Sequence, residues 1–147
     1  LSYLNQNFQM SVKNDQYFTI WYGVLNLDTN QLDYSSAGHP PLILVRNSAD
    51  GEKNQLLKTQ GLPVGMFTEA EYNQDSLVLP SSSNLYIFSD GIYEVHNPKG
   101  EMLGLDKFGE ILRANSHDLT QVLSSVTNYS SNTLFSDDLS IMKVSIT

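Results

Sequence analysis

The stretch NLYIFSDG, residues 84–91, carries the clearest structural signal in the sequence. Its apolar and aromatic residues, from Leu85 to Phe88, favour a β-strand, and the strand ends where Ser89 and Asp90 begin a polar segment. Gly91 follows directly, and a glycine at this point lets the backbone turn sharply. The sequence therefore predicts that the carboxylate of Asp90 lies at the end of a strand.

A second acidic group, Asp137 and Asp138, stands before the final predicted strand, residues 139–146. If the two strands are antiparallel neighbours, the end of one lies beside the start of the other, and the acids gather at one edge of a sheet. Like charges so close together repel one another unless a cation lies between them, and Mg²⁺ and Mn²⁺ prefer oxygen ligands. The pattern predicts a metal site. The alternative is that both acidic groups are solvated turns.

The rest of the sequence predicts an α+β domain built on antiparallel sheet, because strands in hairpin order precede two late helices. Strands are expected at residues 17–27, 31–37, 42–46, around 55–58, 76–79, 84–89 and 139–146. Helical spacing occurs in residues 1–10 and in two later apolar sets: Leu105, Phe108, Ile111 and Leu112, then Leu119, Val122, Leu123 and Val126. Ser116 or Asp118 is the expected N-cap of the last helix. The strand 17–27 is apolar on both parities, so we expect it to be covered on both faces.

The composition excludes several classes of function. The chain has 147 residues, of which 40% are hydrophobic, so we expect one domain with its own core. The net charge of −8 argues against a basic surface for nucleic acid or for an anionic membrane. The absence of Cys excludes disulfides, thiol catalysis and Cys-ligated metal centres, and it fits a reducing compartment. No apolar run approaches the roughly 20 residues that span a bilayer.

Six segments, in this order, resemble those of one known family. They are FTIWYGVL (18–25), AGHPPL (37–42), GLPVG (61–65), FSDGIYE (88–94), NPKGE (97–101) with Gly104, and DDLS (137–140). Each segment is a weak signal alone, but all six in the right order are a strong one. On these segments the chain resembles the metal-dependent (PPM, type 2C-like) protein phosphatases, in particular the bacterial SpoIIE/RsbU group.

The resemblance implies a β-sandwich of two antiparallel sheets flanked by helices, with two ions, Mg²⁺ or Mn²⁺, at one edge of the complete domain. Matched to the family's motifs, Asp90 and Asp137 are expected to be metal ligands. Asp138 occupies a supporting position, Gly91 is the glycine of the Asp-Gly motif, and Glu94 matches an acid that serves a further, weaker metal site in related phosphatases. The family hydrolyses phosphoserine or phosphothreonine with a metal-activated water, so no residue beyond the metal ligands is expected to be catalytic.

One departure from the family's pattern concerns the ligand set. The family supplies further metal-binding acids from segments before the strand that begins at Phe18, and here the only acid before Phe18 is Asp15. We therefore expect residues 1–147 to be a single domain that forms the C-terminal two-thirds of a phosphatase domain, with the N-terminal part missing. This chain alone is expected to bind metal weakly and to turn over little or no substrate.

The resemblance also implies a biological setting. The expected substrate is a phosphoserine on a small antagonist protein that controls an anti-sigma factor, in bacterial stress or developmental signalling in the cytoplasm. An upstream sensor or receiver domain in the same protein is expected to switch the phosphatase, and neither nucleic acid nor membrane insertion is expected to take part. Two alternatives stay open. One is a degenerate phosphatase domain that binds a partner without turnover, and the other is an unrelated all-β ligand-binding protein.

The three histidines do not favour a zinc site, because they are scattered and no Cys accompanies them. His39, in the segment Gly-His-Pro-Pro, is expected to be packed and hydrogen-bonded rather than catalytic. His96 and His117 are expected to be surface residues.

Overall fold

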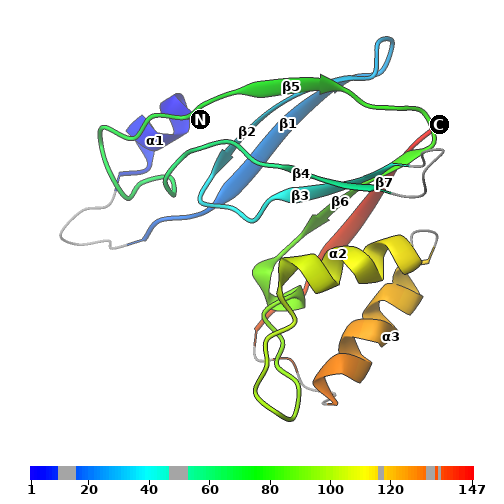
Figure 1. Cartoon of the computed structure of the whole chain (residues 1–147). Helices are drawn as coiled ribbons and strands as arrows, with labels where there is room; N and C mark the ends of the chain where they lie inside the picture. The colour runs from blue at the N-terminus through cyan, green and yellow to red at the C-terminus, as the bar shows by residue number, and fades with distance from the viewer. Residues whose placement is uncertain (10–15, 47–52, 116–117, 132–134, 136) are drawn as a thin grey trace. The chain divides into compact units, whose positions relative to one another are not determined.

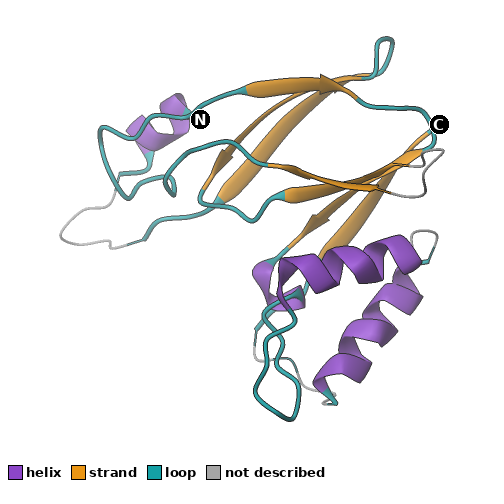
Figure 2. Cartoon of the chain, in the orientation of Figure 1, coloured by secondary structure: helices purple, strands orange, loops and turns teal. Residues whose placement is uncertain are grey.

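The computed structural model describes residues 1–9, 16–46, 53–115, 118–131, 135 and 137–147 (Figure 1). They divide into two compact units. One comprises Leu1–Pro41 and Leu57–Pro80, and the other comprises Leu42–Leu56 and Ser81–Thr147. The strands form two antiparallel sheets, accompanied by helices (Figure 2), so the expected α+β class is confirmed. The expectation of a single domain stays a prediction.

The first unit is built on a three-stranded sheet in the order β1-β2-β5. Its elements are α1 (Ser2–Asn7), β1 (Ile20–Asn26), β2 (Gln31–Ala37) and β5 (Asp75–Val78). Between β1 and β2, the side-chain oxygen of Asn26 accepts hydrogen bonds from the backbone N–H groups of Asp28 and Thr29. Asn30 adopts a left-handed conformation (φ 54°), which asparagine tolerates better than most residues. This turn chemistry supports the register that pairs Asn26 with Gln31.

Strand β1 differs from its expected form in two ways. It begins at Ile20 rather than at residue 17, because Phe18 exchanges backbone hydrogen bonds with Val64 in an isolated bridge. Its Tyr22 and Val24 side chains are 55% and 53% exposed. The expectation of a strand covered on both faces is therefore wrong here. Apolar residues on both parities make burial of both faces favourable, but they do not show that a surface lies over each.

The second unit contains a four-stranded sheet in the order β4-β3-β6-β7. Its strands are β3 (Leu42–Arg46), β4 (Lys53–Leu57), β6 (Ser83–Phe88) and β7 (Ile141–Ile146). Its helices are the 3₁₀ turn η1 (Asp90–Ile92), α2 (Gly104–Ala114) and α3 (Leu119–Ser130). Asp118 is the N-cap of α3, as expected, and its carboxylate accepts a hydrogen bond from the N–H of Thr120 at 2.8 Å. The other expected cap, Ser116, lies outside the described residues.

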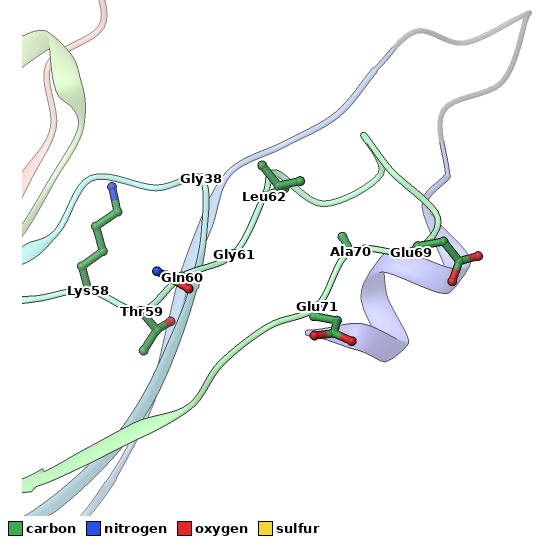
Figure 3. Close-up of a pocket in the computed structure, with 9 residues that line it drawn as sticks. All are labelled: Gly38, Lys58, Thr59, Gln60, Gly61, Leu62, Glu69, Ala70 and Glu71. Atoms are coloured by element: carbon green, nitrogen blue, oxygen red, sulfur yellow. The ribbon is translucent and has the colours of Figure 1, made fainter.

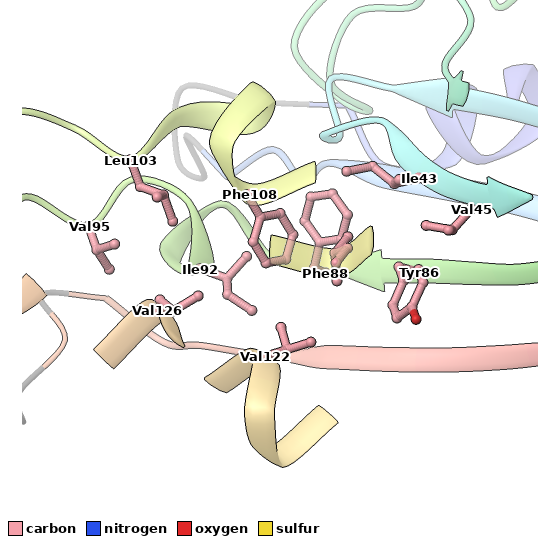
Figure 4. Close-up of a cluster of buried hydrophobic side chains, with 11 residues drawn as sticks. Ile43, Val45, Tyr86, Phe88, Ile92, Val95, Leu103, Phe108, Val122 and Val126 are labelled. Atoms are coloured by element: carbon pink, nitrogen blue, oxygen red, sulfur yellow. The ribbon is translucent and has the colours of Figure 1, made fainter. Parts of the chain in front are cut away.

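A buried apolar cluster packs α2 and α3 against the sheet of the second unit (Figure 4). It contains Ile43, Val45, Tyr86 and Phe88 from strands, Ile92, Val95 and Leu103 from the segment between β6 and α2, and Phe108, Leu112, Val122 and Val126 from helices. The rings of Phe88 and Phe108 meet edge to face, with their centroids 4.9 Å apart. Burying one such side chain contributes about 1.5–3 kcal/mol. The cluster therefore anchors the end of β6, from which Asp90 emerges.

Among the helices of the described ranges, none has both the length and the apolar character needed to cross a membrane.

Candidate metal-binding site

Strands β6 and β7 are antiparallel neighbours, which is the condition on which the predicted site depends. Their register runs from Ser83 opposite Ile146 to Phe88 opposite Ile141. The chain leaves β6 through Ser89 and enters β7 through residues 137–140. Both acidic segments therefore lie at the same end of the sheet, and the predicted pairing of the two strands is confirmed.

Ser89 joins the two acidic segments with three hydrogen bonds. Its backbone N–H donates to the carbonyl oxygen of Ser140 at 3.1 Å. Its hydroxyl donates to the carbonyl oxygen of Asp138 at 3.0 Å and accepts from the N–H of Ser140 at 2.9 Å. The residue before Asp90 is thus bonded to the residue after Asp137.

Gly91 brings the same segments into contact on the other side of Asp90. A Cβ atom built on Gly91 would lie 2.7 Å from the carbonyl oxygen of Asp138 and 3.5 Å from the Cβ of Asp137. The first distance is shorter than real Cβ contacts allow. The φ of Gly91 lies outside the left-handed region, so glycine is needed here for space rather than for its conformational freedom.

The carboxylates of Asp90 and Asp137 are arranged alike. Each residue is exposed, and each Oδ1 accepts a hydrogen bond from the N–H of the next residue, at 3.1 Å in Gly91 and 2.7 Å in Asp138. Among the described residues, no donor bonds to the Oδ2 atom of either carboxylate. One oxygen of each acid is therefore held by a local hydrogen bond.

Tyr93 follows the turn that carries Asp90, and its partly buried side chain packs against the apolar cluster of the second unit. Its N–H donates to the carbonyl oxygen of Asp90 at 3.0 Å, and its ring lies edge to face on Phe88, with centroids 6.1 Å apart. Burial raises the pKa of the Tyr93 phenol, and the negative charges of Glu94 and Asp90 raise it further. The field of the Asp90 carboxylate therefore reaches a partly desolvated neighbour.

The other predicted residues occupy supporting places. Glu94 lies on the turn after η1, where its N–H donates to the carbonyl oxygen of Asp90 at 3.0 Å, and its side chain is exposed. Asp138 contributes its carbonyl oxygen, which contacts both Ser89 and Gly91. Within the described ranges, no group of three or more His, Cys, Asp or Glu side chains is placed to hold a metal ion. The three acids thus do not form a closed ligand cluster, and the assignment of Asp90 and Asp137 as ligands stays a prediction.

The histidines lie apart from this geometry. The ring Nδ1 of His39 donates to the carbonyl oxygen of Pro40 at 2.8 Å, so this histidine is hydrogen-bonded as expected, and its structural role stays a prediction. His96 is exposed and forms an isolated backbone bridge with Met102. His117 lies outside the described residues.

A hollow of about 810 Å³ lies in the first unit (Figure 3). Its lining residues are Gly38, Lys58, Thr59, Gln60, Gly61, Leu62, Glu69, Ala70 and Glu71. Lys58 places a positive charge on this hollow, and Glu69 and Glu71 place negative ones. None of the predicted site residues lines it, so it gives no support to the metal site.

Sequence reasoning did not single out Ser89 as a residue with a role of its own. It precedes the Asp-Gly pair, and a serine there is also common as a simple strand end. Only the pairing of β6 with β7 shows that its hydroxyl bonds to a segment about 50 residues away.

Comparison of structures defines the class of protein to which this fold belongs. The PP2C domain of SiaA from Pseudomonas aeruginosa matches with a TM-score of 0.77 at 19% identity, covering 97% of this chain and 58% of that one. The Mn-presoaked SpoIIE phosphatase domain of Bacillus subtilis matches with a TM-score of 0.63 at 16% identity, covering 87% and 56%. RsbX in complex with magnesium matches with a TM-score of 0.64 at 17% identity, covering 97% and 60%. The fold is that of the PP2C-type phosphatases.

The family follows from sequence. Residues 1–147 match the family described as Stage II sporulation protein E (SpoIIE), so the chain belongs to the SpoIIE family, and the expected resemblance is confirmed. Protein IcfG of Synechocystis sp. is 30% identical over 105 residues, 71% of this chain. The phosphoserine phosphatases RsbP and RsbU of Bacillus subtilis are each 28% identical, over 63% and 68% of this chain. The chain spans only 16%, 22% and 29% of the length of these three relatives.

Proposed function

We propose that this chain is part of a metal-dependent phosphoserine phosphatase domain and supplies two of its metal ligands, Asp90 and Asp137. The observation that carries the proposal is the contact between the two acidic segments at the end of the β6–β7 pair. There a Cβ atom on Gly91 would lie 2.7 Å from the carbonyl oxygen of Asp138, so position 91 has no room for a side chain. Two independent solvated turns would not need so close an approach.

The donor set fits a hard divalent cation. Asp90 and Asp137 offer carboxylate oxygens, which Mg²⁺ and Mn²⁺ prefer over nitrogen or sulfur. Both residues are exposed, and in the described part of the chain only the Oδ1 atom of each carboxylate accepts a hydrogen bond. An exposed pair of this kind suits an ion that retains several waters.

A bound divalent cation supplies two kinds of chemistry: it lowers the pKa of a bound water, and it neutralises charge on a phosphate group. This chain's own residues prepare that function. Asp90 and Asp137 would hold the ion, and Gly91 permits their segments to approach. With a net charge of −8, the chain would otherwise repel a phosphorylated substrate, so a cation at this edge is the source of local positive charge.

We propose that further ligands, and the site of a second ion, come from residues outside this chain. The chain spans 56% to 60% of the solved phosphatase structures that share its fold, which supports this proposal. Asp138 and Glu94 are proposed to assist, Asp138 by holding the loop through its carbonyl oxygen and Glu94 by adding negative charge beside Asp90. The 147 residues alone are then expected to bind metal weakly.

The proposed substrate is a phosphoserine on a small antagonist protein that controls an anti-sigma factor. RsbP and RsbU, two relatives at 28% identity, are named phosphoserine phosphatases, which supports the phosphoserine. Because this substrate is a cytoplasmic signalling protein, the proposed location of the phosphatase is the cytoplasm. From the family we also propose that a sensor or receiver domain in the same protein controls its activity.

The test is metal-dependent hydrolysis of a phosphoserine peptide by the full-length protein that contains this chain. Phosphate release is measured with Mn²⁺, with Mg²⁺ and after chelation, for the wild type, Asp90→Asn and Asp137→Asn. Asp106→Asn is the matched control, because it removes an exposed carboxylate of the same unit at the start of α2. The rate of phosphate release by each site variant is expected to fall by more than about 10- to 100-fold, which is the typical loss when a residue that only supports a metal ligand is replaced.

Two results would contradict the proposal in different ways. If hydrolysis persists after chelation and in both site variants, Asp90 and Asp137 are not metal ligands and belong to solvated turns. A full-length protein that binds the phosphopeptide in the presence of Mn²⁺ but never releases phosphate would favour the degenerate, non-catalytic alternative.

A further inference from the structure

We infer that Ser89 is a positioning residue whose hydroxyl sets the spacing between the Asp90 and Asp137 segments and thereby tunes their affinity for a divalent cation. This inference rests on the proposed metal site. It concerns a residue that does not itself contact the ion.

The first argument is that the Ser89 hydroxyl uses both of its hydrogen-bonding functions on one loop. It donates to the carbonyl oxygen of Asp138 at 3.0 Å and accepts from the N–H of Ser140 at 2.9 Å. The backbone N–H of Ser89 adds a third bond, to the carbonyl oxygen of Ser140 at 3.1 Å. The Ser89 side chain is therefore hydrogen-bonded to both ends of the segment Asp138–Ser140. Asp137 is the residue immediately before this segment.

The second argument is what the hydroxyl does not do. Ser89 occupies the N-cap position of η1 in an extended conformation (φ −81°, ψ 159°), where a serine side chain ordinarily accepts a hydrogen bond from the first turn of the helix. Here the side chain makes no capping bond. Its hydroxyl bonds instead to Asp138 and Ser140, which precede β7. The side chain therefore connects two segments and does not cap its own helix.

The third argument is that Gly91 contacts the same carbonyl group from the other side of Asp90. A Cβ on Gly91 would lie 2.7 Å from the carbonyl oxygen of Asp138, the atom to which the Ser89 hydroxyl donates. Attraction from Ser89 and steric contact at Gly91 therefore act on one peptide unit. Together they determine how far the backbone of Asp90 lies from that of Asp138.

The side-chain requirement follows from these bonds. Alanine at position 89 keeps the backbone bond to Ser140 and loses both hydroxyl bonds. Threonine keeps a hydroxyl that can donate and accept. Ser145 serves as a control for a purely structural role in joining β6 to β7. Its hydroxyl donates to the side-chain oxygen of Asn84 at 2.9 Å, near the other end of the same strand pair.

The experiment measures Mn²⁺ affinity by electron paramagnetic resonance titration of the full-length protein. The variants are Ser89→Ala, Ser89→Thr and the matched control Ser145→Ala, with Asp90→Asn as the reference for a lost ligand. Ser89→Ala is expected to weaken Mn²⁺ binding about 10- to 100-fold, the range for residues that orient a ligand. Ser89→Thr should restore affinity to near the wild-type value, and Ser145→Ala should leave it unchanged.

A second measurement needs no metal. Amide hydrogen exchange in the metal-free protein should show faster exchange of the Ser140 N–H in Ser89→Ala, because that amide loses its acceptor. Ser89→Thr and Ser145→Ala should retain slow exchange at this position. Thermal unfolding of each variant reports whether the fold is intact while these values are compared.

The outcomes separate the inference from the proposed function. If Ser89→Ala binds Mn²⁺ as tightly as the wild type while Asp90→Asn does not, the metal site stands and the positioning role of Ser89 is overturned. An equal loss in Ser89→Ala and Ser145→Ala would also overturn it, since general loosening of the strand pair would then suffice. If Asp90→Asn leaves Mn²⁺ binding unchanged, the proposed metal site itself fails.

Discussion

Replacing Gly91 by alanine tests the closest approach between the two acidic segments. The added methyl group would lie 2.7 Å from the carbonyl oxygen of Asp138 and 3.5 Å from the Cβ of Asp137. The obstacle is a backbone carbonyl, which cannot rotate away as the end of a long side chain can. The turn that carries Asp90 and the loop that carries Asp137 must therefore move apart by several tenths of an ångström.

The magnitude follows from that geometry. Overpacking a tight contact of this kind costs about 1–3 kcal/mol, because the strain is shared between the turn and the loop. The φ of Gly91 lies outside the left-handed region, so no conformational penalty adds to the steric one. Displacing metal ligands by a small distance weakens binding by about 10- to 100-fold, the range measured when the supports of a ligand are removed.

The assay compares Mn²⁺ affinity and unfolding free energy of the full-length protein carrying Gly91→Ala with those of a control matched in stability, Gly100→Ala. Gly100 has a φ of 78°, and a Cβ atom added to it would have no neighbour within 4 Å, so alanine there is strained in conformation but meets no other group. Its cost is about 1–2 kcal/mol. Both variants should lose similar stability, and only Gly91→Ala should lose metal affinity.

The result that would refute this reasoning is equal Mn²⁺ affinity in the two variants at comparable loss of stability. In that case the contact between Gly91 and Asp138 would matter for folding and not for the distance between the acids. Wild-type affinity in Gly91→Ala together with wild-type stability would show that the loop before β7 yields without cost.

Three further predictions concern other parts of the molecule. In the full-length protein, Asp90→Asn and Asp137→Asn should each abolish tight Mn²⁺ binding while changing the unfolding free energy by less than about 0.5 kcal/mol, because both side chains are exposed; calorimetry and chemical denaturation measure the two quantities. Burial and a 3.0 Å hydrogen bond to Asp75 raise the pKa of Tyr34 to about 12. The bond should therefore stabilise the fold by about 1 kcal/mol below pH 10. That contribution should disappear as the pH rises towards 12, so urea denaturation should find the gap between wild type and Tyr34→Phe narrowing over this range. Phe108→Ala removes a fully buried ring from the core of the second unit and should cost about 3–5 kcal/mol in the same assay; a loss below about 1 kcal/mol would show that the cluster does not hold α2 in place.

The local pattern of the sequence predicted most elements because their signals are short-range. The strands expected at residues 17–27 and 31–37 correspond to the hairpin of β1 and β2, and Asp118 was one of two expected caps of α3 because it precedes an apolar helical stripe. The exposure of Tyr22 and Val24 could not be predicted in this way. Whether an apolar face is covered depends on segments distant in sequence, and alternation along one strand carries no information about them.

In the candidate site, too, some features follow from the local sequence and others only from the tertiary structure. That a carboxylate follows one strand and a pair of carboxylates precedes another is a property of the sequence, since strand ends are marked by a change from apolar to polar residues. That Ser89 bonds across to Asp138 and Ser140, and that Gly91 must lack a side chain, is decided only by the antiparallel register of β6 and β7. Register sets contacts between residues almost 50 positions apart, and it depends on the packing of the whole second unit rather than on any local preference of those residues.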